Sequence, residues 1–340
     1  MRASKKVDKI SIAMTTYNGE RFIREQLCSL KNQTLRADEV VIFDDCSSDR
    51  TVEIIKAFIN EFDLDWELSV NEHNHGYIEN FYKAIQATTG DIIFLSDQDD
   101  VWHLEKIETM VGLFQEHKDL QVLSTGFRKI DEHGNPIATK QKLGYTNHGL
   151  IKGHIRKLGL KRIGFQNIFR VNISPGCTAA FAKKCKELYI DNATGQWCHD
   201  WELCIFGGMI DGLFFYNEAL TDYRLHGNNT IGLKDTMTGS LHNDDRYTRL
   251  ELAQMECERT DLYMTQALLD TMGDKNRKIL RRYWRFTSSR VKALENDRLS
   301  AWLQCMRHLT TYLKAVRIRG VIGDLLYIVN HLGRRETVNE

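Results

Sequence analysis

Short apolar runs alternate with amphipathic stretches through the first hundred residues, and this alternation restricts the fold more than any other feature. The apolar runs are rich in Val, Ile and Leu and lie at 10–14, 40–43, 68–70 and 92–95. Between them, apolar residues recur at a spacing of three to four at 21–32, 51–62 and 78–88. This pattern predicts an α/β fold in which a mostly parallel, doubly wound sheet carries helices on both faces.

Each predicted strand is followed by a cluster of polar residues. The clusters lie at 15–20, 44–49, 71–76 and 96–100. In sheets of this kind the ligand crevice lies beyond the carboxyl ends of the strands. We therefore expect all four clusters to meet at one edge of the sheet and to form a binding site there.

The cluster after the fourth strand contains three carboxylates in four positions, Asp97, Asp99 and Asp100. Such crowding is electrostatically unfavourable unless a cation or hydrogen-bond donors offset it. Mg²⁺ or Mn²⁺ fits this role because both prefer oxygen ligands and are often shared with substrate phosphates. The alternative is that Asp99 and Asp100 cap a helix predicted at 102–114, but capping accounts for one aspartate rather than three.

Asp45 lies at the end of the second predicted strand, where its carboxylate can accept the imino N–H of a uracil or thymine ring. Thr15 and Tyr17 follow the first strand and could flank that ring. Ser48 or Asp49, in contrast, is predicted to be an ordinary N-cap of the helix that follows, without a chemical role.

Several sequence blocks resemble those of the family-2 glycosyltransferases. The blocks in the first third of the chain are IAMTTYNGERFIREQLCSLKNQT (12–34), VVIFDDCSSDRTVEII (40–55) and GDIIFLSDQDDVWHLEKI (90–107). Further blocks are SPGCTAAF (174–181), HDWELCIFG (199–207) and YRLHGNNTIG (223–232). The resemblance covers residues 8–235 and implies the GT-A nucleotide-sugar-binding fold. Within the family the chain is most similar to bacterial rhamnosyltransferases that assemble surface polysaccharides.

The resemblance also implies roles for individual residues in binding the donor. Thr15, Tyr17 and Asp45 match the positions that hold the pyrimidine base. Asp97 and Asp99 match the Asp-x-Asp motif, in which the first aspartate lies near the ribose and the second binds the metal.

Two residues from the later blocks are implied to act at the reacting end of the donor. Asp200 matches the catalytic base, and His226 matches a histidine that joins the metal or the diphosphate. His199 stands where the family usually has Glu, which removes one acceptor near the incoming sugar. Asp200 could also serve the N-terminus of a helix predicted at 201–206, where a carboxylate meets the positive end of the helix dipole.

Together these features predict a metal-dependent, inverting glycosyltransferase. The preferred donor is dTDP-rhamnose and the preferred acceptor a saccharide or lipid-linked saccharide in surface-polysaccharide biosynthesis; a UDP-hexose is the alternative donor. A nucleotidyltransferase is a weaker alternative, because it would need a basic, glycine-rich loop after the first strand. Residues 15–20 contain one Gly and no Lys or Arg.

The formal net charge of zero conceals a strong asymmetry along the chain. Residues 275–335 hold 15 Lys/Arg and 3 Asp/Glu, whereas residues 1–274 hold 31 Lys/Arg and 41 Asp/Glu. We expect a GT-A catalytic domain at 1–235 and a helical, basic C-terminal region at 236–340, with a charge boundary near Gly273. A nucleic-acid-binding module would use the basic tail but leave the aspartates without a purpose, so no nucleic-acid partner is predicted.

The predicted C-terminal helices lie at 245–272, 277–294, 298–316 and 321–332. Between 298 and 335 they combine arginines with Trp, Leu and Tyr, which favours contact with an anionic membrane surface; packing on a second copy of the chain is the alternative. The 8 cysteines form no CxxC pair, and no signal peptide or long apolar run is found. These features predict a cytoplasmic protein, peripheral on the inner face of the cell membrane.

Overall fold

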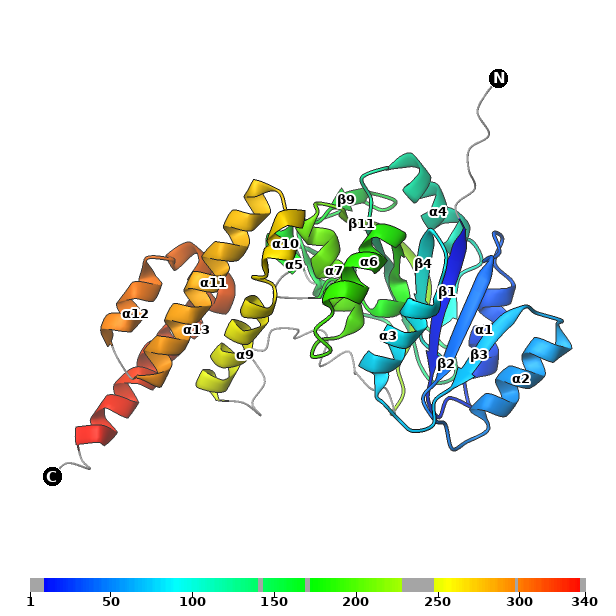
Figure 1. The fold of residues 1–340 in the computed structure, drawn as a ribbon, viewed down its shortest axis with the longest axis horizontal. Helices are drawn as coiled ribbons and strands as arrows, with labels where there is room; N and C mark the ends of the chain where they lie inside the picture. The colour runs from blue at the N-terminus through cyan, green and yellow to red at the C-terminus, as the bar shows by residue number, and fades with distance from the viewer. Residues whose placement is uncertain (1–8, 140–142, 169–171, 228–247, 297–298, 337–340) are drawn as a thin grey trace, which may run out of the picture. The chain divides into compact units, whose positions relative to one another are not determined.

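The computed structural model describes residues 9–139, 143–168, 172–227, 248–296 and 299–336. The chain divides into two units, Met1–Met237 and Thr238–Glu340. The first unit contains the sheets and the second is helical (Figure 1).

The strand–helix alternation predicted from the sequence forms one half of the main sheet. Its strands are β1 (Ile10–Thr16), β2 (Glu39–Asp44), β3 (Trp66–Val70) and β4 (Ile92–Ser96), and the helices between them are α1 (Ile23–Lys31), α2 (Thr51–Glu61) and α3 (Tyr77–Ala87). All three strand pairs, β1–β2, β1–β4 and β2–β3, are parallel. Every residue of β1 and β4 is buried, which explains why these runs are almost continuously apolar.

The other half of the sheet brings in strands from distant parts of the unit. Its elements are β5 (Val101–Trp102), α4 (Lys106–Glu116), β6 (Val122–Ile130), β9 (Leu160–Arg162), α5 (Phe165–Ile168), β10 (Ala179–Ala182), α6 (Lys183–Asn192), α7 (His199–Met209) and β11 (Leu213–Arg224). The strand order is β3-β2-β1-β4-β10-β6-β11-β5, with β9 also paired to β11. β10 is antiparallel to both β4 and β6, whereas β6 and β11 are parallel. A separate small sheet pairs β7 (Tyr145–Thr146) with β8 (Ile151–Lys152), next to a 3-10 turn at Asn147–Gly149.

Helices pack in two groups in the first unit: α1 contacts α2, while α3, α6 and α7 contact one another. The structure therefore confirms the predicted α/β class with a mostly parallel sheet and a helical C-terminal region.

The helix predicted at 102–114 begins later than expected. Val101 and Trp102 form β5, which pairs with Thr221 and Asp222 of β11, and α4 starts only at Lys106. A local pattern cannot reveal pairing with a strand more than 100 residues away. Because no helix follows Asp99 and Asp100 directly, the alternative that they cap one is wrong.

The second unit consists of five helices within its described residues. They are α9 (Arg249–Leu262), α10 (Gln266–Thr271), α11 (Asp274–Glu295), α12 (Leu299–Met306) and α13 (Leu309–Glu336). The single helix predicted at 245–272 is divided, and the Thr265 side chain accepts a hydrogen bond from the Leu268 N–H at the start of α10. The break predicted at 316–321 is absent, because α13 continues through it. Residues 245–247 and 298 of these predictions lie outside the described residues.

An ion cluster joins three helices of the second unit. The Arg290 guanidinium on α11 lies 2.8 Å from Asp324 on α13 and 3.3 Å from Glu256 on α9, and all three side chains are buried. The Tyr312 hydroxyl donates to Asp324 at 2.7 Å. Separating the helices would leave buried charges without their counter-charges, so the cluster holds α9, α11 and α13 against one another. Across the described residues, none of the helices has both the length and the apolar character that spanning a bilayer demands.

Candidate active site at the carboxyl edge of the sheet

The loops after β1 and β4 are joined by one side chain, that of Gln98. Its amide oxygen accepts from the Tyr17 N–H, and its amide nitrogen donates to the Tyr17 carbonyl, both at 2.8 Å. A Cβ on Gly19 would lie 2.2 Å from the Gln98 amide oxygen, so a larger residue there would displace the Gln98 side chain from this position. The Thr15 side chain is buried, whereas the Tyr17 ring is 47% exposed and available to a ligand. Sequence reasoning did not identify Gln98, since a loop glutamine carries no periodic signal.

Asp45 lies at the end of β2 with its carboxylate already hydrogen-bonded. The carboxylate accepts from the side-chain amide of Asn71 at 2.9 Å and from the main-chain N–H groups of His75 and Gly76 at 2.9 and 2.8 Å. These two N–H groups lie at the start of α3, and Gly76 has a positive φ of 83°. Asp45 therefore holds the loop between β3 and α3 against the end of β2.

The Asp99 carboxylate meets His226, which follows β11. The Asp99 Oδ2 atom lies 2.7 Å from His226 Nε2, and both side chains are largely buried. The imidazole ring also packs against Phe22, with ring centroids 4.8 Å apart. The fold thus brings together the two residues that the sequence predicts as metal ligands.

Arg224, two residues before His226, fixes the acidic loop in place. Its main-chain N–H donates to the Asp100 carboxylate at 3.0 Å, and its guanidinium Nε donates to the Asp99 carbonyl at 2.8 Å. Another guanidinium nitrogen donates to Glu25 of α1 at 2.6 Å. Arg224, at the end of β11, therefore positions both Asp99 and Asp100, a role that the sequence did not reveal.

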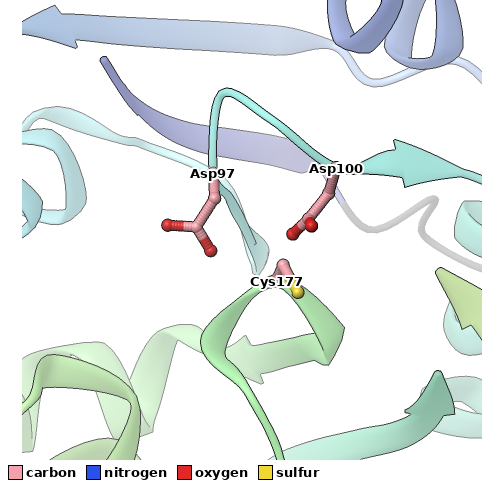
Figure 2. Close-up of side chains that lie close together, drawn as sticks. All are labelled: Asp97, Asp100 and Cys177. Carbon is pink, nitrogen blue, oxygen red and sulfur yellow. The ribbon is translucent and has the colours of Figure 1, made fainter. Parts of the chain in front are cut away.

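Asp97, Asp100 and Cys177 face one another in the interior of the site (Figure 2). One potential ligand atom from each lies within 4.8 Å of the others. Burial, together with the charges of Asp100 and Asp99, raises the pKa of Asp97 well above its usual range. Burial and the Asp99 charge raise the pKa of Asp100 to about 7. Burial, together with the charges of Asp100 and Asp97, raises the pKa of the Cys177 thiol, which disfavours the reactive thiolate.

Lys106 supplies a buried positive group next to these carboxylates. Its ammonium donates to the Cys177 carbonyl and, at 2.9 Å, to the Thr221 hydroxyl, and it lies 3.6 Å from the Trp102 ring centroid. Burial lowers its pKa to about 7, whereas the charge of Asp100 opposes that shift. The sequence contained a signal for it: Lys106 falls on the same face of α4 as Met110 and other buried apolar residues.

Asp200 is the second residue of α7 and is largely buried. Its Oδ2 atom accepts from the Asn172 side-chain amide at 2.9 Å. Burial raises its pKa to about 6, although the Asn172 hydrogen bond opposes the shift. Its charge also contributes to the raised pKa of Asp97, which places both carboxylates in one electrostatic environment. A carboxylate that titrates near neutral pH suits a general base.

His199, beside Asp200, is a buried neutral ring. It stacks on Phe81 with centroids 3.6 Å apart, and burial lowers its pKa to about 3. Neither ring nitrogen has a hydrogen-bond partner among the residues that the structure describes. A Cβ on Gly176 would lie 3.1 Å from His199 Nε2 and 3.2 Å from Asp200 Cβ, so this glycine allows its segment to approach both residues closely.

A sheet of this order with an acidic loop at its carboxyl edge defines the GT-A class of nucleotide-sugar-binding folds. The chain belongs to glycosyl transferase family 2, whose family model matches residues 11–183. The predicted family and fold are thereby confirmed.

Relatives of this family match over different lengths. The dTDP-rhamnosyl transferase RfbG of Shigella flexneri is 28% identical over 262 residues, which cover 73% of this chain and 82% of RfbG. EpsE of Bacillus subtilis is 30% identical over 126 residues, covering 37% of this chain and 45% of EpsE. The match to the poly(ribitol-phosphate) beta-N-acetylglucosaminyltransferase TarS of Staphylococcus aureus covers 38% of this chain and 22% of TarS. The chain thus spans less than half the length of the last two.

Solved structures agree on the fold. The crystal structure of residues 1–349 of S. aureus TarS with UDP-GlcNAc superposes with a TM-score of 0.55 at 15% identity, covering 97% of this chain and 92% of that one. The mannosyltransferase PcManGT from Pyrobaculum calidifontis, in complex with GDP-Man and Mn²⁺, gives a TM-score of 0.51 at 16% identity, covering 94% and 88%.

Proposed function

We propose that this chain is an inverting glycosyltransferase that moves a sugar from a nucleotide donor to a hydroxyl group of a saccharide or lipid-linked saccharide. The observation that carries the proposal is the arrangement at one site of the Asp99–His226 pair and of Asp200, a buried carboxylate with a pKa of about 6. The family membership of residues 11–183 supports it.

The donor side of the site is proposed to use Thr15, Tyr17, Asp45 and Asp97. The exposed Tyr17 ring supports stacking on the base, and the position of Asp45 at the end of β2 supports a contact with the imino N–H. Three hydrogen bonds already reach the Asp45 carboxylate, which still has acceptor capacity because its two oxygens offer about four lone-pair sites.

Asp99 and His226 are proposed to hold Mg²⁺ or Mn²⁺. Their carboxylate oxygen and imidazole nitrogen lie 2.7 Å apart, so both can turn toward one ion, and oxygen-rich donor sets suit these two metals. When bound, the ion would neutralise negative charge on the departing diphosphate.

Asp200 is proposed to act on the acceptor. Its ionised carboxylate takes the proton of the acceptor hydroxyl, whose oxygen forms the new bond to the anomeric carbon. The bond from that carbon to the diphosphate oxygen breaks, and the nucleoside diphosphate leaves from the opposite face, which inverts the anomeric configuration. Asn172 orients the carboxylate by donating to Oδ2.

L-Rhamnose from dTDP-rhamnose is the proposed donor sugar, and the match to RfbG over 73% of the chain supports it. A UDP-hexose is the second candidate, favoured by the sequence match to TarS, a structure of which contains UDP-GlcNAc. Surface-polysaccharide biosynthesis is the proposed setting. We also propose that residues 298–335 contact the cytoplasmic face of the cell membrane. The alternative is that this segment packs against a second copy of the chain in a homodimer.

A donor screen tests the proposed function. The purified chain is incubated with dTDP-rhamnose, UDP-hexoses or a nucleoside triphosphate, each with Mn²⁺, Mg²⁺ or EDTA, and nucleoside diphosphate and pyrophosphate are quantified. We expect cation-dependent release of nucleoside diphosphate from dTDP-rhamnose. Release of nucleoside diphosphate from a UDP-hexose but not from dTDP-rhamnose would show that the donor is a UDP-hexose. Release of pyrophosphate from the nucleoside triphosphate, with no release of nucleoside diphosphate from any sugar donor, would overturn the proposal in favour of nucleotidyl transfer.

A further inference from the structure

A strongly basic hollow lies within the helical unit. It has a volume of about 540 Å³ and is lined by Lys278, Arg281, Arg282 and Arg285 of α11, and by Arg307 and His308 between α12 and α13. The three helices contact one another, as Figure 1 shows. We call this feature the basic hollow.

The five Lys/Arg side chains of the basic hollow have no ion-pair partner within the described part of the chain. Other cations of the same helix are paired: Arg277 lies 3.1 Å from Asp274, and Arg290 contacts Asp324 and Glu256. None of the described residues in the lining is a carboxylate. Within the described part of the chain the positive charges of the hollow are therefore not offset by ion pairs, although carboxylates offset cations elsewhere on α11.

His308 lines the basic hollow together with Arg282, Arg285 and Arg307. Partial burial lowers the pKa of this imidazole, and the charges of Arg282, Arg285 and Arg307 lower it further. Like charges held this close are unfavourable unless an anion offsets them, and a concave site concentrates their field on one ligand. The geometry thus favours binding of an anion with several negative oxygens.

The side chains are arranged on one surface of α11. Positions 278, 281, 282 and 285 follow the three- and four-residue spacing of a single helix face. Arginine presents a planar fork of donors that matches phosphate oxygens. Thr310 adds a hydroxyl to the lining at the first turn of α13.

We propose that the basic hollow binds a phosphate group, and that this phosphate is the headgroup of an anionic lipid. Exposed leucines favour the lipid as its carrier. Leu303 is 56% exposed and lies one helical turn before Arg307, and Leu309 is 41% exposed between His308 and Thr310. Apolar side chains next to cations are suited to the boundary between headgroups and acyl chains. The inference deepens the proposed membrane contact of residues 298–335 and does not depend on sugar transfer.

Vesicle flotation with the full chain tests the proposal. Vesicles of phosphatidylcholine alone are compared with vesicles that contain phosphatidylglycerol, using wild type and the double variant Arg281→Gln/Arg285→Gln. The control is Lys275→Gln/Lys292→Gln, which removes the same charge from exposed positions of α11 outside the lining. We expect the hollow variant to bind anionic vesicles about thirtyfold more weakly and the control to remain within about threefold of wild type.

Further outcomes decide against the proposal. An equal loss in the two double variants would show that net charge alone attracts the chain to vesicles. Calorimetry with inorganic diphosphate tests whether the hollow binds a free phosphate compound instead of a lipid headgroup. If Arg281→Gln/Arg285→Gln lost affinity for diphosphate but bound anionic vesicles like wild type, the lipid assignment would be overturned. Equal melting temperatures by circular dichroism exclude unfolding, and nucleoside diphosphate release in solution distinguishes failure here from failure of the proposed function.

Discussion

Asp99 and His226 are 127 residues apart in the sequence, yet their side-chain atoms lie 2.7 Å from each other. We predict that Asp99→Ala abolishes metal-dependent binding of nucleoside diphosphate, because the carboxylate that would hold the cation is gone. Calorimetry with nucleoside diphosphate and Mn²⁺ measures this, with the EDTA titration of wild type as the reference. An affinity in the presence of Mn²⁺ that equals the wild-type value would remove Asp99 from the metal site.

Asp200 gives the proposed reaction a definite pH dependence. A base must be ionised, and burial raises the pKa of Asp200 to about 6, so kcat/KM should fall about tenfold per pH unit below pH 6 and level off above pH 7. Asn172→Ala removes a hydrogen bond that lowers this pKa, so its profile should shift to higher pH. Nucleoside diphosphate affinity at each pH serves as the control. If Asn172→Ala left the pH profile of kcat/KM unchanged, the assignment of that profile to Asp200 would be contradicted.

At the scale of elements, Asp45 connects the end of β2 to the start of α3. Asp45→Ala leaves the N–H groups of His75 and Gly76 without their acceptor, so the free energy of unfolding should fall by about 1–3 kcal/mol. Urea denaturation measures the change, and Asp65→Ala, at an exposed position, is the matched control. If Asp45→Ala weakened donor binding and left the stability unchanged, the carboxylate would serve the ligand rather than the loop.

The elements that the sequence predicted well are those with a local period. The four apolar runs and the helices between them correspond to β1–β4 and α1–α3. Burial imposes a local apolar pattern on β1, β2 and β4, whereas β3 is partly exposed. β10 was not predicted as a sheet strand, because it is inserted between β4 and β6 through long-range pairing.

The site shows the same division between local and distant information. Clustered carboxylates in a predicted crevice pointed to Asp97 and Asp99 before any contact was known. The functions of Gln98 and Arg224 depend on partners far away in the chain, and local patterns carry no information about those partners. Lys106 could have been found, since a lysine on an apolar helix face is unusual.

At the scale of the whole molecule, the described contacts divide the chain at Met237 rather than at the charge boundary near Gly273. We propose that residues 1–237 fold independently and retain nucleoside diphosphate binding. A chain ending at Gly273 should be less stable than residues 1–237, because it keeps α9 with the buried Glu256 but loses Arg290, the ion-pair partner of Glu256. Thermal unfolding by circular dichroism and calorimetry of both truncations test this. Failure of 1–237 to unfold cooperatively, with 1–273 behaving as wild type, would contradict the division.

The most direct test of the account as a whole is transfer by Asp200→Asn. Asparagine keeps the shape of the side chain and caps helices about as well as aspartate, but it cannot take a proton from the acceptor. We predict unchanged affinity for nucleoside diphosphate with Mn²⁺ and a turnover lower by about 10²–10⁴-fold, while the exposed control Asp191→Asn remains at the wild-type rate. Transfer by Asp200→Asn within a factor of a few of wild type would contradict the account, because Asp200 would then be only a part of the helix end.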